Sequence, residues 1–194
     1  MSQEIEIEFK NFLTKAQYEQ LLIHFQVQST QIVRQANHYF DTPTQHLKQL
    51  ASGLRIREVG EAIECTLKER TAQHSHLETT NPLTRSQADD MLATGTVHAP
   101  DVQIRLETLS VPLHELALFG SLVTDRVELP YQGGLLVLDH SFYLHCEDYE
   151  VEYETTDESV GQQIFEQFLQ QFNIEKQPTP KKIARFVNAL QQKG

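Results

Sequence analysis

From Glu4 to Lys10 charged and apolar side chains alternate strictly, and no other feature constrains the fold of this chain as much. The even positions of this segment hold three carboxylates and an ammonium, and the odd positions hold Ile5, Ile7 and Phe9. A period of two predicts a β-strand, on which these two sets point to opposite faces. Three carboxylates within about 14 Å of strand repel one another unless a cation lies between them. Taken alone, the segment fits an ordinary half-buried strand as well as a metal-binding one.

The same alternation recurs in several later segments, and this repetition favours a special role for the charged face. The later segments are residues 54–57, 64–68, 123–128, 136–139 and 149–154. Many strands with one apolar and one charged face predict a sheet whose charged face lines a shared interior, as a closed barrel does. Opposite charges that face a common interior neutralise one another, which an isolated charged face cannot do.

Two capping boxes mark the starts of helices. In each box a threonine is followed three residues later by a glutamine, at Thr14 and Gln17 and again at Thr84 and Gln87. Each pair satisfies backbone N–H groups that the first helical turn leaves without partners. We therefore predict one helix from residue 15 to about residue 25, and a second helix that is closed by Gly95.

Apolar spacing and further end signals predict the remaining helices. Their predicted ranges are residues 101–109, 113–119, 158–173 and 181 to about 192. The apolar residues of 101–109 also fit a strand, but a helix is favoured. Gly120 is expected to stop the short helix that precedes it. Thr179 as N-cap and Pro180 at the first helical position predict the start of the last helix.

Length, charge and cysteine content limit the classes of function. A chain of 194 residues is long enough to bury one core, so we predict a single domain over residues 1–194. The net charge of −11 argues against a nucleic-acid polymer as partner, because a broad basic surface is missing. The sequence has neither an apolar run of roughly 18 residues nor a signal-peptide core. We expect a cytoplasmic monomer or homodimer without a membrane partner, in which Cys65 and Cys146 are buried thiols.

Basic residues are few but concentrated in the patterned segments. Those that lie in patterned segments are Lys10, Arg55, Arg57, Lys68, Arg126, Lys182 and Arg185. A basic interior within an acidic exterior favours a small, highly charged anion over a polymer as the ligand. The nine histidines show no spacing typical of a zinc or metalloprotease site.

At this point the motifs resemble those of a known family. The segment from Glu6 to Lys10 resembles the ExExK signature of the CYTH superfamily, the triphosphate tunnel metalloenzymes. Other elements follow in the family's order: Arg55, Arg57, Lys68, Arg126, Asp139, Glu150, Glu152 and the Lys182–Phe186 segment. Lys181 stands where serine is usual, which affects a local hydroxyl contact. The chain most resembles the small YjbK-like branch of Gram-positive bacteria. The resemblance implies an α+β fold, a closed eight-stranded antiparallel β-barrel that binds a triphosphate in its lumen, with helices packed outside.

The resemblance also implies which residues form the site. Carboxylates around Mg²⁺ or Mn²⁺ would be Glu6, Glu8, Asp139, Glu150 and Glu152. Substrate-binding bases would be Lys10, Arg55, Arg57, Lys68, Arg126, Lys182 and Arg185. Of these two sets, Lys10, Arg57 and Glu150 are expected to act in catalysis. A triphosphate carries roughly four negative charges, for which arginine offers paired donors, while carboxylate oxygens suit hard divalent cations. Whether Glu4, Glu78 and Glu154 also face the lumen is left open.

Several functions fit this set of residues. The first is a metal-dependent phosphohydrolase, most simply an inorganic tripolyphosphatase that acts on a small triphosphate. The alternatives are a thiamine triphosphatase, a class IV adenylate cyclase, and a non-catalytic module that binds polyphosphate or nucleotide. The cyclases of this superfamily extend ExExK upstream with a His-Phe pair, whereas the five residues before Glu6 include neither His nor Phe. This difference makes adenylate cyclase a less favoured function than the phosphohydrolase.

Overall fold

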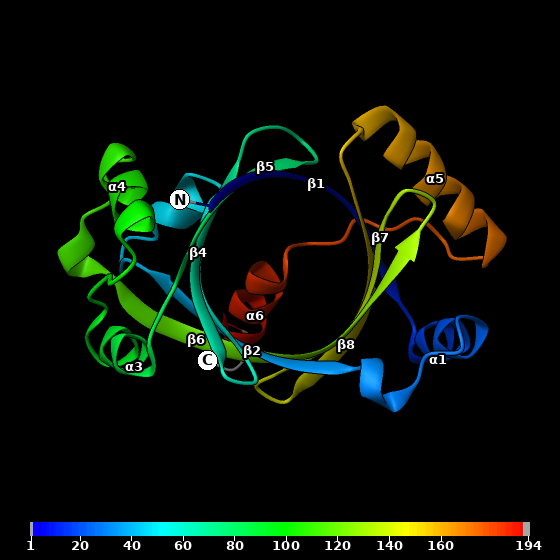
Figure 1. The fold of residues 1–194 in the computed structure, drawn as a ribbon, viewed down its shortest axis with the longest axis horizontal. Helices are drawn as coiled ribbons and strands as arrows, with labels where there is room; N and C mark the ends of the chain where they lie inside the picture. Colours follow the sequence, from blue (N-terminus) through cyan, green and yellow to red (C-terminus); the bar gives the residue numbers. More distant parts are fainter. Residues whose placement is uncertain (1, 192–194) are drawn as a thin grey trace. The chain divides into compact units, whose positions relative to one another are not determined.

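The computed structural model describes residues 2–191, and its eight strands form a closed barrel in the order β1-β5-β4-β3-β2-β6-β7-β8 (Figure 1). The strands are β1 (Ser2–Leu13), β2 (Val33–Asp41), β3 (Gly53–Val59), β4 (Ala62–Arg70), β5 (Ser75–Pro82), β6 (Ala117–Tyr131), β7 (Gly134–Tyr143) and β8 (Cys146–Thr155). The helices are α1 (Lys15–His24), α2 (His46–Gln49), α3 (Arg85–Thr94), α4 (Pro100–Thr108), α5 (Glu158–Gln171) and α6 (Lys182–Gln191), with 3-10 turns η1 (Ser29–Gln31) and η2 (Leu113–Glu115). The predicted α+β barrel is confirmed, and every segment with alternating charge is a strand.

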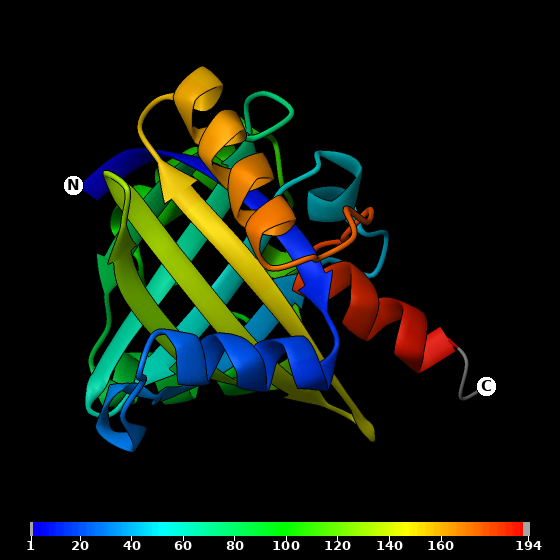
Figure 2. The same cartoon turned by 90° about the vertical axis from the view of Figure 1, so that its right-hand side faces the viewer.

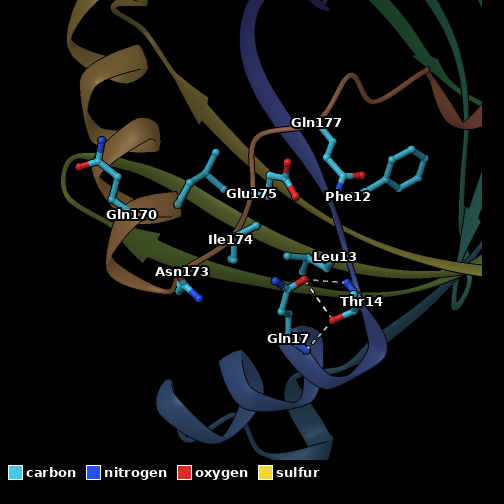
Figure 3. Close-up of a pocket in the computed structure, with 10 residues that line it drawn as sticks. Phe12, Leu13, Thr14, Gln17, Gln170, Asn173, Ile174, Glu175 and Gln177 are labelled. Atoms are coloured by element: carbon cyan, nitrogen blue, oxygen red, sulfur yellow. Dashed lines mark hydrogen bonds between the residues drawn. The ribbon is translucent and has the colours of Figure 1, made fainter.

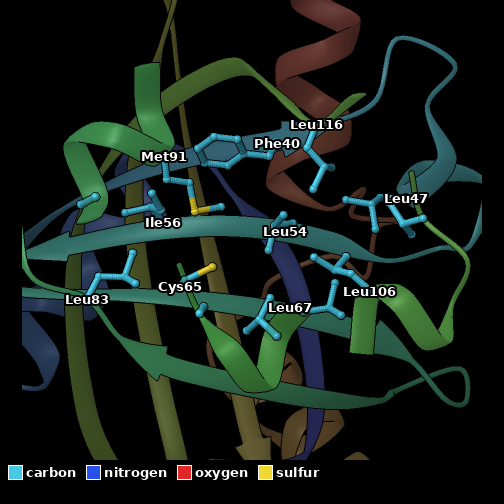
Figure 4. Packing of buried hydrophobic residues seen from close by; sticks show 14 of the residues in the cluster. Phe40, Leu47, Leu54, Ile56, Cys65, Leu67, Leu83, Met91, Leu106 and Leu116 are labelled. Atoms are coloured by element: carbon cyan, nitrogen blue, oxygen red, sulfur yellow. The ribbon is translucent and has the colours of Figure 1, made fainter. Parts of the chain in front are cut away.

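The chain divides into two compact units, each with its own apolar core. The first unit is built on Gln35–Leu122, and its core lies between one face of β3 and β4 and the helices α3 and α4. Figure 4 shows Ile56, Cys65 and Met91 in this core. Because strand side chains alternate, the opposite face of β3 and β4 presents the arginines and lysine that the sequence predicted for the barrel interior.

The second unit comprises Glu6–Arg34 and the chain from Val123 onward. Its core lies between α1 and α5 and one face of β1, β7 and β8, and Figure 2 shows both helices against these strands. The rings of Phe9 and Phe165 stack with their centroids 6.1 Å apart. The predicted range 158–173 agrees with α5, whose apolar stripe is buried in this core. Helical packing against the apolar faces leaves the charged faces to line the barrel.

Both capping boxes form as predicted. The side chain of Thr14 accepts a hydrogen bond from the backbone of Gln17, and Thr84 does the same from Gln87. Gly95 closes α3 in a left-handed conformation at φ 79°. The helix favoured over residues 101–109 is present as α4. None of the described helices is long and apolar enough to cross a membrane.

The predicted helix over residues 113–119 is wrong. Only the single 3-10 turn η2 forms there, strand β6 starts at Ala117, and Gly120 lies within that strand. β6 is the neighbour of β2 in the barrel, and His38 of β2 contacts Ser121 of β6 with a side-chain hydrogen bond of 2.7 Å. A neighbouring strand satisfies the backbone of this segment, and that pairing overrides its local helical pattern.

The predicted start of the last helix is also wrong. The hydroxyl oxygen of Thr179 accepts a hydrogen bond from the backbone N–H of Phe12, at 2.9 Å, instead of capping a helix. The backbone N–H groups of Ala184 and Arg185 donate to the carbonyl of Lys181, so α6 begins after Lys181. The predicted end at residue 192 lies outside the described residues. Cys146 also differs from expectation, because it is only half-buried, whereas Cys65 is buried as predicted.

Candidate functional site

Three buried carboxylates meet on the second unit, and we call them the carboxylate cluster: Asp139 of β7 with Glu150 and Glu152 of β8. Asp139 lies directly opposite Glu150 in the antiparallel register. Asp139 and Glu150 are completely buried, and Glu152 is only 5% exposed. One oxygen atom from each carboxylate lies within 4.8 Å of those of the other two. Such a set of hard oxygen donors fits a hard divalent cation.

Basic side chains from two other elements neutralise the carboxylate cluster. The Lys182 ammonium of α6 lies 2.8 Å from oxygens of both Asp139 and Glu152 and also pairs with Glu150. Arg126 of β6 donates two hydrogen bonds to Asp139, at 2.9 and 2.6 Å, and one to Glu152 at 2.9 Å. Each carboxylate of the cluster is therefore already in contact with a cation.

Arg185, one turn further along α6, contacts the next acidic positions of β8. It pairs with Glu150, and its guanidinium lies 2.8 Å from an oxygen of Asp148. The same guanidinium lies over the ring of Phe12, 4.9 Å from the ring centroid. The two cations of α6 thus point toward the acidic face of β7 and β8.

Burial and neighbouring charge act in opposite directions on this cluster. Burial alone would raise the pKa of Asp139, but the cations Arg126 and Lys182 hold it well below its usual value. The pKa of Glu152 is raised, first by burial and then by the carboxylate of Glu8. Burial also raises the pKa of Glu154 to about 8, and Glu6 adds to this. Burial and like charge therefore both disfavour ionisation of Glu152 and Glu154, and a cation bound beside them would favour it.

The first strand continues this acidic face. Glu8 is buried and lies opposite Glu154, and Lys10 lies opposite Glu152. The Lys10 ammonium donates a hydrogen bond of 2.6 Å to Glu8. Glu6 is half-buried on the same face of β1. Glu4, which the sequence left open, is exposed.

Arg55, Arg57 and Lys68 form a basic cluster on the first unit, on the face of β3 and β4 away from α3 and α4. Lys68 lies opposite Glu78 of β5, and its ammonium is 3.3 Å from that carboxylate. Burial opposes ionisation of Glu78, but Arg55 and Lys68 lower its pKa below the usual value. The Arg57 guanidinium donates to the side-chain oxygen of Asn37 at 3.1 Å. This concentration of positive charge suits a phosphate-bearing anion.

Every predicted site residue lies on a strand or helix of one of these two groups. The second unit holds Glu6, Glu8, Lys10, Arg126, Asp139, Glu150, Glu152, Lys182 and Arg185, and the first unit holds Arg55, Arg57 and Lys68.

The sequence prediction missed two polar contacts, those of Asp148 and Asn37, and left Glu78 and Glu154 undecided. Asp148 and Glu154 continue the even-numbered alternation of Glu150 and Glu152, which was a usable signal. Asn37 gave no such signal, because an uncharged residue does not stand out in the pattern.

A separate cavity of about 720 Å³ lies where β1 ends, beside α1 and the C-terminal end of α5 (Figure 3). Its walls include the amides of Gln17, Gln170, Asn173 and Gln177, and the carboxylate of Glu175. Its lining contains no basic side chain. A triphosphate would find no counter-charge there, so the cavity does not compete with the barrel interior as the candidate site.

Comparisons with a family model, a relative and solved structures all point to the same family. A family model described as the CYTH domain matches residues 4–187. The candidate triphosphatase YjbK of Bacillus subtilis (strain 168) is 44% identical over 186 residues, which are 96% of each protein. The crystal structure of a candidate adenylate cyclase from Bacillus halodurans has a TM-score of 0.92 at 38% identity, covering 96% of this chain and 99% of that one. HpAC1 from Hippeastrum, a candidate adenylyl cyclase described with a dominant triphosphatase activity, is similar in fold, with a TM-score of 0.79 at 22% identity over 96% of both chains.

Proposed function

The chain belongs to the CYTH domain family, and from this premise we propose that it is a divalent-metal-dependent triphosphatase whose simplest substrate is inorganic tripolyphosphate. The observation that carries the proposal is the carboxylate cluster, three buried acids that face cations in the interior of a barrel. Burying several carboxylates costs free energy unless cations bind them. A bound metal would neutralise the carboxylates, and a bound polyanion would neutralise the basic side chains. The name of the Bacillus subtilis relative supports the same reaction.

Carboxylates of β1, β7 and β8 would hold Mg²⁺ or Mn²⁺. The residues that we assign to this role are Glu6, Glu8, Asp139, Glu150 and Glu152. When bound, the metal would withdraw charge from phosphoryl oxygens and so favour attack at phosphorus. Oxygen-rich sites of this kind favour Mg²⁺ and Mn²⁺ over softer metals.

Basic residues would bind the phosphate oxygens, and water would attack the terminal phosphorus. The assigned residues are Lys10, Arg55, Arg57, Lys68, Arg126, Lys182 and Arg185. Lys10 and Arg57 would stabilise the charge that develops on the transferred phosphoryl group, and Glu150 would orient the groups around it. The bridging P–O bond breaks, so tripolyphosphate and water yield phosphate and pyrophosphate.

Adenylate cyclase is the second candidate, because the similar Bacillus halodurans structure is described in those terms. Cyclisation uses the ribose hydroxyl of ATP as the nucleophile and needs groups that recognise the nucleoside. The five residues given before Glu6 do not contain the His-Phe pair that the superfamily's cyclases place upstream of ExExK. Bare triphosphate, by contrast, needs only the charged residues already named. Thiamine triphosphate is the alternative organic substrate for the same hydrolysis.

A substrate panel tests the proposal. We expect the purified protein with Mg²⁺ or Mn²⁺ to release phosphate and pyrophosphate from tripolyphosphate and to make little cyclic AMP from ATP. The panel includes thiamine triphosphate, and a metal chelator serves as the negative control. Hydrolysis that persists in the chelator, or full activity in the Glu6→Gln and Glu8→Gln variants, would refute the metal assignment. Cyclic AMP as the main product would establish the cyclase instead.

A further inference from the structure

Lys182 stands where a metal ion would have to bind. Its ammonium contacts oxygens of all three members of the carboxylate cluster, two of them at 2.8 Å. The same oxygens lie within 4.8 Å of one another and are the donors that a divalent cation needs. An ammonium group and a metal ion cannot occupy one set of oxygens together, so Lys182 and the metal compete.

The position of Lys182 depends on the linker between α5 and α6, because this linker is fastened to β1. The fastening residue is Asn11, whose side chain is completely buried. Its amide nitrogen donates to the backbone carbonyls of Phe12 and Glu175, both at 2.9 Å. Its side-chain oxygen accepts from the backbone N–H of Gln177 at 2.7 Å. Asn11 thus uses both faces of its amide to bind the linker.

A second contact extends this anchor almost to the helix. The hydroxyl of Thr179 accepts from the backbone N–H of Phe12 at 2.9 Å and donates to the carbonyl of Gln177 at 3.1 Å. Lys182 follows three residues later, a span of about 10 Å at most. The linker beside β1 is visible in Figure 3 at Glu175 and Gln177. The start of α6 therefore has little freedom as long as the anchor is intact.

We propose that Asn11 is a positioning residue: by fastening the linker to β1 it holds Lys182 in the carboxylate cluster, where the lysine competes with the metal and stays available to bind phosphate. This inference rests on the proposed function, because it concerns the metal and the triphosphate of the same site. Releasing the anchor should strengthen metal binding and weaken triphosphate binding, whereas general damage to the fold would weaken both.

Binding measurements on the full-length protein test the inference with Asn11→Ala and Lys182→Gln. Mn²⁺ binding is measured by calorimetry without phosphate, and tripolyphosphate binding is measured in the presence of a chelator, where no hydrolysis is expected. We expect both variants to bind Mn²⁺ about tenfold more tightly and tripolyphosphate about tenfold more weakly, each a change of about 1.4 kcal/mol. The double variant should add little to Lys182→Gln, because both changes act through one side chain.

Controls separate positioning from loss of structure. Gln177→Ala removes an exposed side-chain amide from the same linker but keeps the backbone N–H that binds Asn11, and it should change neither affinity. If Asn11→Ala does not fold, Thr179→Val weakens the same anchor and should show the same pair of opposite shifts. Weaker binding of both ligands by the anchor variants, or unchanged Mn²⁺ affinity, overturns the inference. A wild-type protein that binds Mn²⁺ but leaves tripolyphosphate intact would instead count against the proposed function.

Discussion

Arg126 bridges two strands by donating to both Asp139 and Glu152, and all three side chains are buried. Burial lowers the pKa of a guanidinium, but the two carboxylates more than compensate and keep Arg126 charged. Removing one partner from such a group leaves an unpaired buried charge, which costs about 3–5 kcal/mol. Substitutions among these residues must therefore be checked for folding before an activity loss is assigned to chemistry.

Arg57 also offers a test of phosphate binding, and its guanidinium donates a hydrogen bond of 3.1 Å to the neutral side chain of Asn37. We expect Arg57→Ala to lower kcat/KM for tripolyphosphate by roughly 10²-fold or more, since removal of a comparable electrostatic donor costs about 2–4 kcal/mol of transition-state stabilisation. Steady-state kinetics with thermal unfolding as a companion measurement checks this. Arg34→Ala is the matched control, because Arg34 pairs with Asp125 in a largely exposed salt bridge. Equal activity of the two variants would show that Arg57 does not bind the substrate.

Glu78 should contribute to stability in a pH-dependent manner. Arg55 and Lys68 lower its pKa against the effect of burial, so ionised Glu78 stabilises the folded state above its unfolded pKa of about 4.3. This contribution is lost as the pH falls toward the folded pKa. Glu78→Gln should therefore lower the unfolding free energy at pH 7 by about 1–3 kcal/mol and flatten its decline between about pH 5 and 3. Denaturant titrations across this pH range measure the effect, with the exposed Glu61→Gln as control. Equal unfolding free energies of the two variants at every pH would refute the assignment.

Among the elements, α4 is capped from another part of the fold. Its N-cap position is Ala99, which has no side-chain acceptor. The side-chain oxygen of Asn81, on β5, instead accepts from the backbone N–H groups of Asp101 and Val102 at 3.0 and 3.2 Å. The amide nitrogen of Asn81 also donates to the Asp101 carboxylate at 2.8 Å. A strand residue thus satisfies the donors that a local threonine satisfies at α1 and α3.

This borrowed cap predicts a measurable loss. Asn81→Ala should lower the unfolding free energy by about 1–2 kcal/mol, because it leaves the first-turn N–H groups of α4 without their acceptor. Urea unfolding followed by circular dichroism measures the effect. Glu107→Gln, on the exposed side of the same helix, should be nearly neutral. A loss no larger than that of the control would show that water replaces the cap without cost.

At the scale of the whole molecule, each compact unit buries an apolar core beneath its helices, and the charged side chains of its strands lie on the face away from those helices. Each compact unit has its own helix-covered core, so the barrel interior is not needed to bury apolar surface. The interior can therefore hold many ionised groups, and the net charge of −11 shows that acids outnumber bases overall. Ligands that bind this interior would stabilise the entire fold, because they bind only to the folded chain.

We therefore expect Mg²⁺ and tripolyphosphate together to raise the melting temperature. At ligand concentrations near 100 times Kd the gain is about 2.7 kcal/mol, or about 5–10 °C for a chain of this size. Calorimetry with rapid scans measures the shift. Sulfate at the same ionic strength is the control for screening, and a chelator should reverse the metal-dependent part. A shift reproduced in full by sulfate would mean that screening alone is responsible.

The sequence by itself determined the strands, the separation of charged and apolar side chains onto opposite strand faces, and the helices with local signals. Alternation reports which side chains share a face, and a capping box such as Thr14 with Gln17 is complete within four residues. Only the tertiary structure decided that residues 117–119 belong to β6, that Thr179 binds β1, and that Asn81 caps α4. These features depend on partners that are distant in the chain. Local residue preferences do not identify such partners. For the same reason the competition between Lys182 and a metal ion could be inferred only once α6 was placed against β7 and β8.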